Sequence, residues 1–189
     1  MATRVHVSAD EFLRDPSCAN WCELVRGEVL RLSPTGPLHG HVVGNLYAPL
    51  AAFVREHRLG WAFSDNVGFR LPVAEEEGDT VRSPDAAFIS YARLPALIPG
   101  FVRGAPELAA EVLSPDDTAE QLRDRIDDYF TSGTRLMWIV DPTSRRVTVH
   151  SASAPIRSLG VGETLDGGDV LPGLAIPVAA LFDGLEPRG

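Results

Sequence analysis

The spacing of hydrophobic positions changes several times along the chain, and these changes predict an alternation of helices and strands. Val43, Leu46, Leu50 and Phe53 recur at helical spacing, which predicts a long helix over residues 40–57. Pro49 lies inside that span and is expected to kink or split the helix. Short apolar runs bounded by turn residues predict strands, which cover residues 23–25, 28–32, 61–71, 85–90, 107–113, 136–140 and 146–150.

Polar residues mark two further helix starts. Ser8 with Glu11 fits a capping box, and so does Asp117 with Glu120. The first of these helices is expected to stop at Pro16, which cannot continue it. The helices predicted from these caps cover residues 9–15 and 117–132.

The remaining segments complete an α+β pattern. Residues 91–106 are rich in proline and are expected to form an irregular loop, and the acidic residues 75–79 are expected to form a solvated turn. The glycine-rich tail, residues 158–182, is expected to pack as a strand and a short helix. The pattern predicts a central mixed β-sheet flanked by helices, in a single domain over residues 1–189 with its core at about residues 8–182.

The composition is typical of one globular domain, with 189 residues, 44% of them hydrophobic and 23% charged. Cys18 and Cys22 cannot form a disulfide framework and have no metal-binding spacing. The sequence has no signal-peptide pattern and no apolar run of membrane-spanning length. A cytoplasmic protein with no membrane partner is therefore expected.

The charge pattern restricts the possible partners. The formal net charge of −9 argues against a broad basic surface for nucleic acid, although it allows a local groove lined by arginine. All 17 basic residues are arginine, and the sequence contains no lysine. This bias acts on the whole chain, and it matters wherever a reaction would ordinarily use a lysine.

Two carboxylates stand out because they lie in apolar runs: Asp85 in SPDAAFIS and Glu111 in PELAAEVLSP. An acidic group in such a run is costly to bury unless something pairs with it. If the two strands pair antiparallel, the start of the first lies beside the end of the second, and the carboxylates converge. A hard cation such as Mg²⁺ would then offset their repulsion. The alternative, about equally well supported by the spacing, is that each carboxylate is a strand-end residue in a salt bridge or turn.

The order of the segments resembles the Uma-type restriction endonuclease family (domain of unknown function 820) of the PD-(D/E)XK nuclease superfamily. The resemblance extends from about Ser8 to Phe182. The matching stretches are CELVRGEVLRLSP, PLH before the long helix, SPDAAFIS, PELAAEVLSP, RIDDYFTSG, MWIVDP and a final LPGL followed by LF.

This resemblance implies a restriction-endonuclease-like fold with N-terminal and C-terminal hairpin additions. It also implies an endonuclease that hydrolyses DNA phosphodiester bonds with Mg²⁺, for which Mn²⁺ would substitute. Asp85 and Glu111 would be catalytic residues that act as ligands of the metal. Many nucleases of this fold act as dimers, so a homodimer is expected by analogy.

The same resemblance assigns a third catalytic position to Arg125, four residues before Tyr129 on the predicted helix. Relatives place a lysine there. Arginine can stabilise negative charge but cannot act as a base, because it stays protonated. The alternative is a surface arginine paired with Asp124 or Asp128.

Three supporting residues are also implied. Glu23 would be a further ligand of the metal or water, His39 would contact a phosphate or a carboxylate, and Gln121 would hydrogen-bond the site. Their alternatives are a solvated hairpin edge, a local capping residue and a solvated helix position respectively.

A second hypothesis belongs to another class. The arginine at the lysine position and the acidic net charge favour a catalytically inactive nuclease-fold module with a nucleic-acid-binding or regulatory role.

Overall fold

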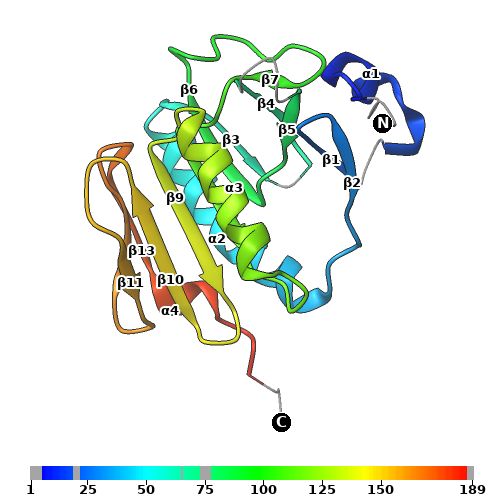
Figure 1. Cartoon of the computed structure of the whole chain (residues 1–189). Helices are drawn as coiled ribbons and strands as arrows, with labels where there is room; N and C mark the ends of the chain where they lie inside the picture. Colours follow the sequence, from blue (N-terminus) through cyan, green and yellow to red (C-terminus); the bar gives the residue numbers. More distant parts are fainter. Residues whose placement is uncertain (1–5, 19–21, 65, 73–77, 187–189) are drawn as a thin grey trace.

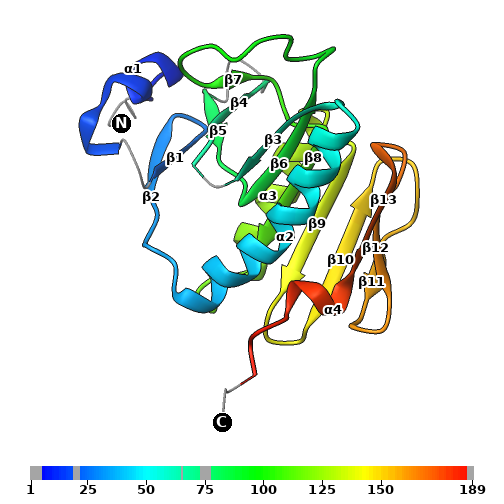
Figure 2. The same ribbon diagram turned by 180° about the vertical axis from the view of Figure 1, so that it is seen from behind.

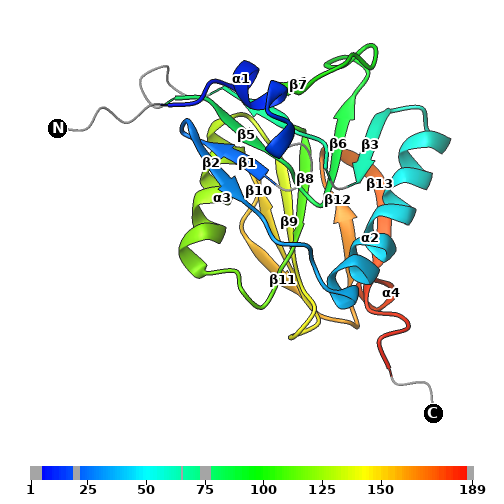
Figure 3. The ribbon, with the colours of Figure 1, turned by 90° about the vertical axis from the view of Figure 1, so that its right-hand side faces the viewer.

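A six-stranded mixed sheet forms the centre of the molecule, with one long helix on each face (Figures 1 and 3). The computed structural model describes residues 6–18, 22–64, 66–72 and 78–186. The helices are α1 (Ala9–Arg14), the 3₁₀ turn η1 (Pro16–Cys18), α2 (Pro37–Glu56), α3 (Ala119–Thr131) and α4 (Val178–Leu181). None of the helices in the described part of the chain combines the length and the apolar character that crossing a bilayer requires.

The central sheet has the strand order β11-β10-β9-β8-β6-β3. Strands β8 and β9 are parallel and are joined through α3, whereas the other neighbouring strands in this sheet are antiparallel. Its strands are β3 (Gly60–Ser64), β6 (Ala86–Ser90), β8 (Leu108–Val112), β9 (Leu136–Asp141), β10 (Arg146–Ser151) and β11 (Arg157–Leu159).

Two smaller sheets complete the fold. The first has the order β2-β1-β5-β4-β7 and lies beside the central sheet with α1 (Figure 2). The second is a C-terminal hairpin that packs with α4 on the side of α2. Their strands are β1 (Cys22–Val25), β2 (Glu28–Arg31), β4 (Phe69–Leu71), β5 (Thr80–Arg82), β7 (Val102–Arg103), β12 (Thr164–Gly167) and β13 (Leu171–Pro177).

Within the described part of the chain, the buried hydrophobic side chains form three clusters that follow these layers. The largest lies between the central sheet, α2 and the C-terminal hairpin, and it includes Leu46 and Trp138. A second lies under α3 and contains Tyr129. The third is small and joins α1 to the N-terminal sheet; its buried members are Ala9, Phe12, Leu24 and Val81.

The α+β class with mixed sheets is confirmed, and most predicted elements are present within a few residues. The predicted split at Pro49 is wrong, because α2 runs unbroken from Pro37 to Glu56. Val42, Leu46, Leu50 and Val54 are all buried on one side of it, and this packing holds the helix together across the proline.

Other differences concern short strands and one cap. Strand β5 was not expected, β7 lies within the predicted irregular loop, and the tail forms three strands before α4. The cap of α3 is Thr118 with Gln121, one residue later than the predicted box of Asp117 with Glu120. The acidic turn predicted at 75–79 falls mostly outside the described residues, which resume at Gly78.

Candidate functional site

Strands β6 and β8 bring Asp85 and Glu111 to the same end of the central sheet. The predicted antiparallel pairing is confirmed, with Ala86 opposite Ala110 and Ala87 opposite Ala109. Asp85 immediately precedes the first pair and Glu111 immediately follows it. Because alternate residues of a strand share a face, Glu111 lies on the side of the sheet that α3 covers.

A cleft of about 540 Å³ opens at this end of the sheet, between the N-terminal sheet and the starts of α2 and α3. Every residue that the sequence proposed for the site lines this one cleft. These residues are Glu23, His39, Asp85, Glu111, Gln121 and Arg125. They come from five separate segments of the chain, so the fold, rather than proximity in sequence, gathers them.

Asp85 is held at the cleft by two neighbours. Its Oδ2 accepts a hydrogen bond of 2.6 Å from the backbone N–H of Val112, and it lies 3.2 Å from Nε2 of His39. His39 sits in the first turn of α2 and is largely buried, so the structure places it against a carboxylate. One oxygen of Asp85 is thereby fixed in direction, which fixes the direction of the other.

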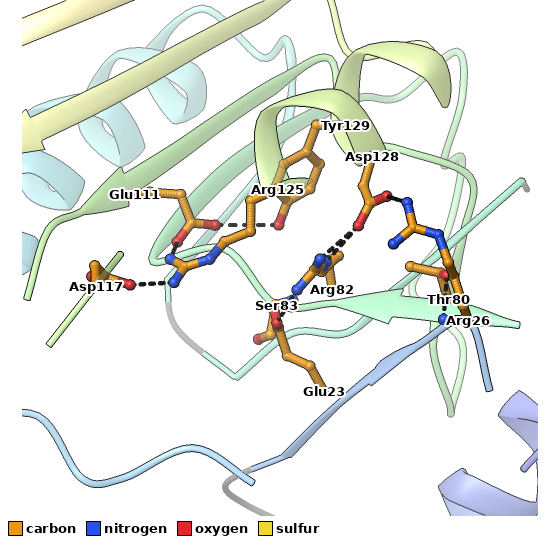
Figure 4. Close-up of polar contacts among 10 residues, drawn as sticks. All are labelled: Glu23, Arg26, Thr80, Arg82, Ser83, Glu111, Asp117, Arg125, Asp128 and Tyr129. Atoms are coloured by element: carbon orange, nitrogen blue, oxygen red, sulfur yellow. Dashed lines mark hydrogen bonds and ion pairs between the residues drawn. The ribbon is translucent and has the colours of Figure 1, made fainter. Parts of the chain in front are cut away.

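Glu111 is only 5% exposed and makes its contacts with α3 (Figure 4). Its Oε2 lies 3.1 Å from Nη1 of Arg125, and its Oε1 lies 3.5 Å from the hydroxyl of Tyr129. Burial and the nearby charge of Asp85 raise the pKa of Glu111 well above its usual range, and the attraction of Arg125 only partly offsets this. A buried, repelled carboxylate of this kind favours an added positive charge beside it.

The raised pKa predicts how stability depends on pH. A carboxyl group whose pKa is higher in the folded state contributes stability below its unfolded pKa of about 4.3 and loses it as the pH rises through the folded value. In the presence of a chelator, the wild type should therefore lose stability relative to Glu111→Gln as the pH rises from about 4.3 through the raised folded value. Thermal unfolding of both proteins across this range measures the difference. Parallel pH profiles would contradict the prediction.

Arg125 bridges two acids. One guanidinium nitrogen contacts Glu111 and another contacts Asp117, in the loop before α3 (Figure 4). Burial opposes its charge, but Glu111 and Asp117 outweigh burial and raise the pKa of Arg125. The alternative pairing with Asp124 or Asp128 is not what the structure has, and Arg125 instead faces the cleft.

Glu23 and Gln121 have different surroundings. Glu23 is 5% exposed, which rules out the solvated hairpin edge; its Oε1 accepts a 2.8 Å hydrogen bond from the N–H of Ser83, and its Oε2 lies 2.7 Å from Arg82. Gln121 lines the cleft but is exposed, and its side-chain oxygen accepts hydrogen bonds from the N–H and hydroxyl of Thr118. Its observed contacts are therefore those of a helix cap.

Sequence reasoning missed Arg82, the buried arginine behind Glu23. It contacts Glu23 on one side and Asp128 of α3 on the other (Figure 4). The signal was its position three residues before Asp85, next to Val81 in a short run that the structure shows to be strand β5. A charged residue that close to a candidate ligand, in a strand, needs a partner.

Asp85 and Glu111 are cleft carboxylates that could hold a hard cation such as Mg²⁺. Among the described residues, no group of three or more His, Cys, Asp and Glu side chains is arranged to enclose a metal ion. Mg²⁺ does not require such an enclosure, because it commonly takes one or two carboxylates and completes its shell with water and phosphate oxygens. Asp85 and Glu111 offer that pair, with a mutual repulsion that a cation would relieve.

The α+β fold thus brings two acids and an arginine together in one cleft. The family follows from comparison: the model of the Uma2 family, described as "Putative restriction endonuclease", matches residues 9–179. The chain belongs to this family, as the segment order indicated.

A solved structure supports the fold. The crystal structure of a putative nuclease belonging to DUF820 from Anabaena variabilis ATCC 29413 is similar with a TM-score of 0.77 and 20% identity. The similarity covers 93% of this chain and 97% of that one. No curated protein matches the chain.

Proposed function

We propose that the protein is an endonuclease that hydrolyses DNA phosphodiester bonds with Mg²⁺, on a restriction-endonuclease-like core with hairpin additions at both ends. The observation that carries the proposal is the convergence of Asp85, Glu111 and Arg125 in one cleft. Family membership adds support, because the description of the matched family reads "Putative restriction endonuclease".

In this proposal Asp85 and Glu111 would hold the metal ion. The bound ion would polarise the phosphate and lower the pKa of the attacking water. Val112 and His39 direct the Asp85 carboxylate, and Arg125 supplies a permanent positive charge beside Glu111. That charge would offset the negative charge that develops on the phosphate in the transition state. Mn²⁺ would substitute for Mg²⁺, since both prefer oxygen ligands.

A homodimer would allow both strands of a duplex to be cut. We expect a homodimer by analogy with other nucleases of this fold. The test of the proposal is cleavage of plasmid and single-stranded DNA by the wild type with Mg²⁺, with Mn²⁺ and with chelator. Cleavage that requires the metal supports the proposal. If the wild type cleaves no DNA with either metal, the proposal is overturned.

The second candidate function is a catalytically inactive module that retains the fold and binds nucleic acid or regulates a partner. The observation in its favour is that Arg125 forms ion pairs with both Glu111 and Asp117, at the position where the family resemblance implies a lysine. Arginine cannot take a proton from water at neutral pH. DNA binding by gel shift without cleavage would favour this candidate.

Replacing that arginine by lysine should raise the rate of metal-dependent cleavage. A lysine ammonium cannot bridge Glu111 and Asp117 in the planar, two-armed manner of arginine, so it would leave the Glu111 carboxylate freer to hold a metal ion. We expect Arg125→Lys to be at least about tenfold faster, since a group that controls the orientation of a metal ligand typically changes activity about 10–100-fold. Initial rates on plasmid DNA measure this.

Arg123→Lys on the same helix, at an exposed position, is the matched control and should leave the rate unchanged. Cleavage by Arg125→Lys alone, with an inert wild type, would identify the natural chain as the inactive module. An equal or lower rate in Arg125→Lys would contradict the prediction and make arginine the functional residue at this position.

A further inference from the structure

Arg82 lies at the junction of the segments that build the cleft. Its side chain is 5% exposed, and its Nη1 lies 2.7 Å from Oε2 of Glu23. Its Nε and Nη2 lie 3.0 Å and 2.6 Å from Oδ2 of Asp128 (Figure 4). One planar guanidinium thus binds two buried carboxylates on opposite sides.

The two carboxylates belong to different layers of the molecule. Glu23 is on β1 of the N-terminal sheet, and Asp128 is on α3, which covers the central sheet. Arg82 itself ends β5, three residues before Asp85. Arg82 therefore connects β1 in one wall of the cleft with α3 in the opposite wall. It also lies at the end of β5, just before the segment that carries Asp85.

The charges of this cluster balance. A second arginine, Arg26, lies 3.1 Å from Oδ1 of Asp128, and its backbone N–H donates to the hydroxyl of Thr80. The sequence of side chains Glu23, Arg82, Asp128 and Arg26 alternates in sign and sums to zero. Glu23, Arg82 and Asp128 are the buried members of this cluster, whereas Arg26 is partly exposed, and buried charges are tolerated when each is paired in this way.

The orientation of Glu23 depends on both of its contacts. Ser83 N–H binds Oε1 and Arg82 binds Oε2, so neither oxygen can turn away from the cleft that the residue lines. Asp128 follows Arg125 by three residues on α3, which is close to one helical turn. The contact of Arg82 with Asp128 therefore also fixes the part of α3 that carries Arg125.

We propose that Arg82 is the positioning residue of the cleft: it fixes the Glu23 carboxylate toward the site and holds α3 at the distance that puts Arg125 beside Glu111. This inference rests on the proposed nuclease function for its activity readout. Arg82 acts through Glu23 and Arg125 and touches no substrate in this scheme.

Arg82→Lys tests the proposal, because lysine keeps the charge but cannot hold two carboxylates with a rigid planar group. Metal-dependent DNA cleavage by the folded variant should show kcat lowered about 10- to 100-fold, the usual effect of losing a group that orients a metal site. KM should change by less than about twofold, because the substitution removes stabilisation of the transition state and leaves substrate binding unchanged. Circular dichroism and thermal unfolding establish that the variant is folded.

Arg157→Lys is the matched control. Arg157 also binds one aspartate, Asp166, with two nitrogens, but the pair is exposed and joins β11 to the C-terminal hairpin. Its variant should retain wild-type kcat. If Arg82→Lys does not fold, Glu23→Gln replaces it, since this variant leaves Arg82 paired with Asp128 and should itself lower kcat about tenfold.

The outcomes separate this inference from the proposed function. If the wild type cleaves DNA and the folded Arg82→Lys variant cleaves it equally fast, the positioning role is overturned and the nuclease function stands. The same holds for Glu23→Gln where it replaces Arg82→Lys. A wild type that cleaves nothing with either metal overturns the nuclease function. In that case the side-chain Nε–H resonance of Arg125 decides: a shift in Arg82→Lys but not in Arg157→Lys supports the role of Arg82, and no shift in either overturns it.

Discussion

Asp85→Ala and Glu111→Ala should each lower metal-dependent DNA cleavage at least about a hundredfold, since loss of even an outer group of a metal site costs about 10–100-fold. Each substitution removes one of the two carboxylates that face the cleft from β6 and β8. Without its partner, the remaining carboxylate would bind the ion weakly, because Mg²⁺ needs charge as well as oxygen ligands.

The effect is best measured as the rate of plasmid nicking at saturating Mg²⁺, together with metal affinity from calorimetry. Asp166→Ala is the control, because Asp166 is an exposed aspartate of the C-terminal hairpin whose partner is Arg157. Weakened metal binding and lost cleavage should occur together in Asp85→Ala and Glu111→Ala. If all three variants cleave DNA as fast as the wild type, these two carboxylates do not form the active site.

Asp128→Ala should lower the free energy of unfolding by about 3–5 kcal/mol, as is typical when one partner of a buried ion pair is removed. Asp128 is 4% exposed. Its Oδ2 accepts hydrogen bonds from Nε and Nη2 of Arg82, and its Oδ1 pairs with Arg26. After the substitution, the buried guanidinium of Arg82 would keep Glu23 as its carboxylate partner but lose the other.

Urea unfolding of Asp128→Ala and Asp166→Ala compares the loss of a buried aspartate–arginine ion pair with the loss of an exposed one. Both substitutions remove an aspartate from an arginine, but the pair of Asp166 with Arg157 is exposed and should account for about 0–1 kcal/mol. The prediction is a large difference in the unfolding midpoint between the two variants. Similar small losses in both would show that water compensates the charge of Arg82.

Local patterns predicted the elements well because the responsible interactions are local. The capping box of Ser8 with Glu11 is present, and the hairpin of β1 with β2 follows the two apolar runs that predicted it. The convergence of Asp85 with Glu111 was also predictable, because strand alternation and antiparallel pairing suffice to place both at one end of the sheet.

Contacts between distant segments were beyond the sequence pattern. Nothing local indicates that Arg82 lies between Glu23 and Asp128, since each partner is more than forty residues away in the chain. The unbroken helix at Pro49 has the same origin, because packing against the sheet overrides a local helix-breaking preference. The cap of α3 moved by one residue because Asp117 is engaged by Arg125 and by the N–H of Ser114.

The small third cluster of hydrophobic side chains has a consequence for motion. One wall of the cleft rests on Ala9, Phe12, Leu24 and Val81, whereas the strands that carry Asp85 and Glu111 rest on two larger clusters. Local opening requires less free energy where fewer apolar contacts must separate. The part of this wall formed by α1 and β1 is therefore the part of the cleft that opens most readily, and the ion pairs of Arg82 and Arg26 with Asp128 restrain it against α3.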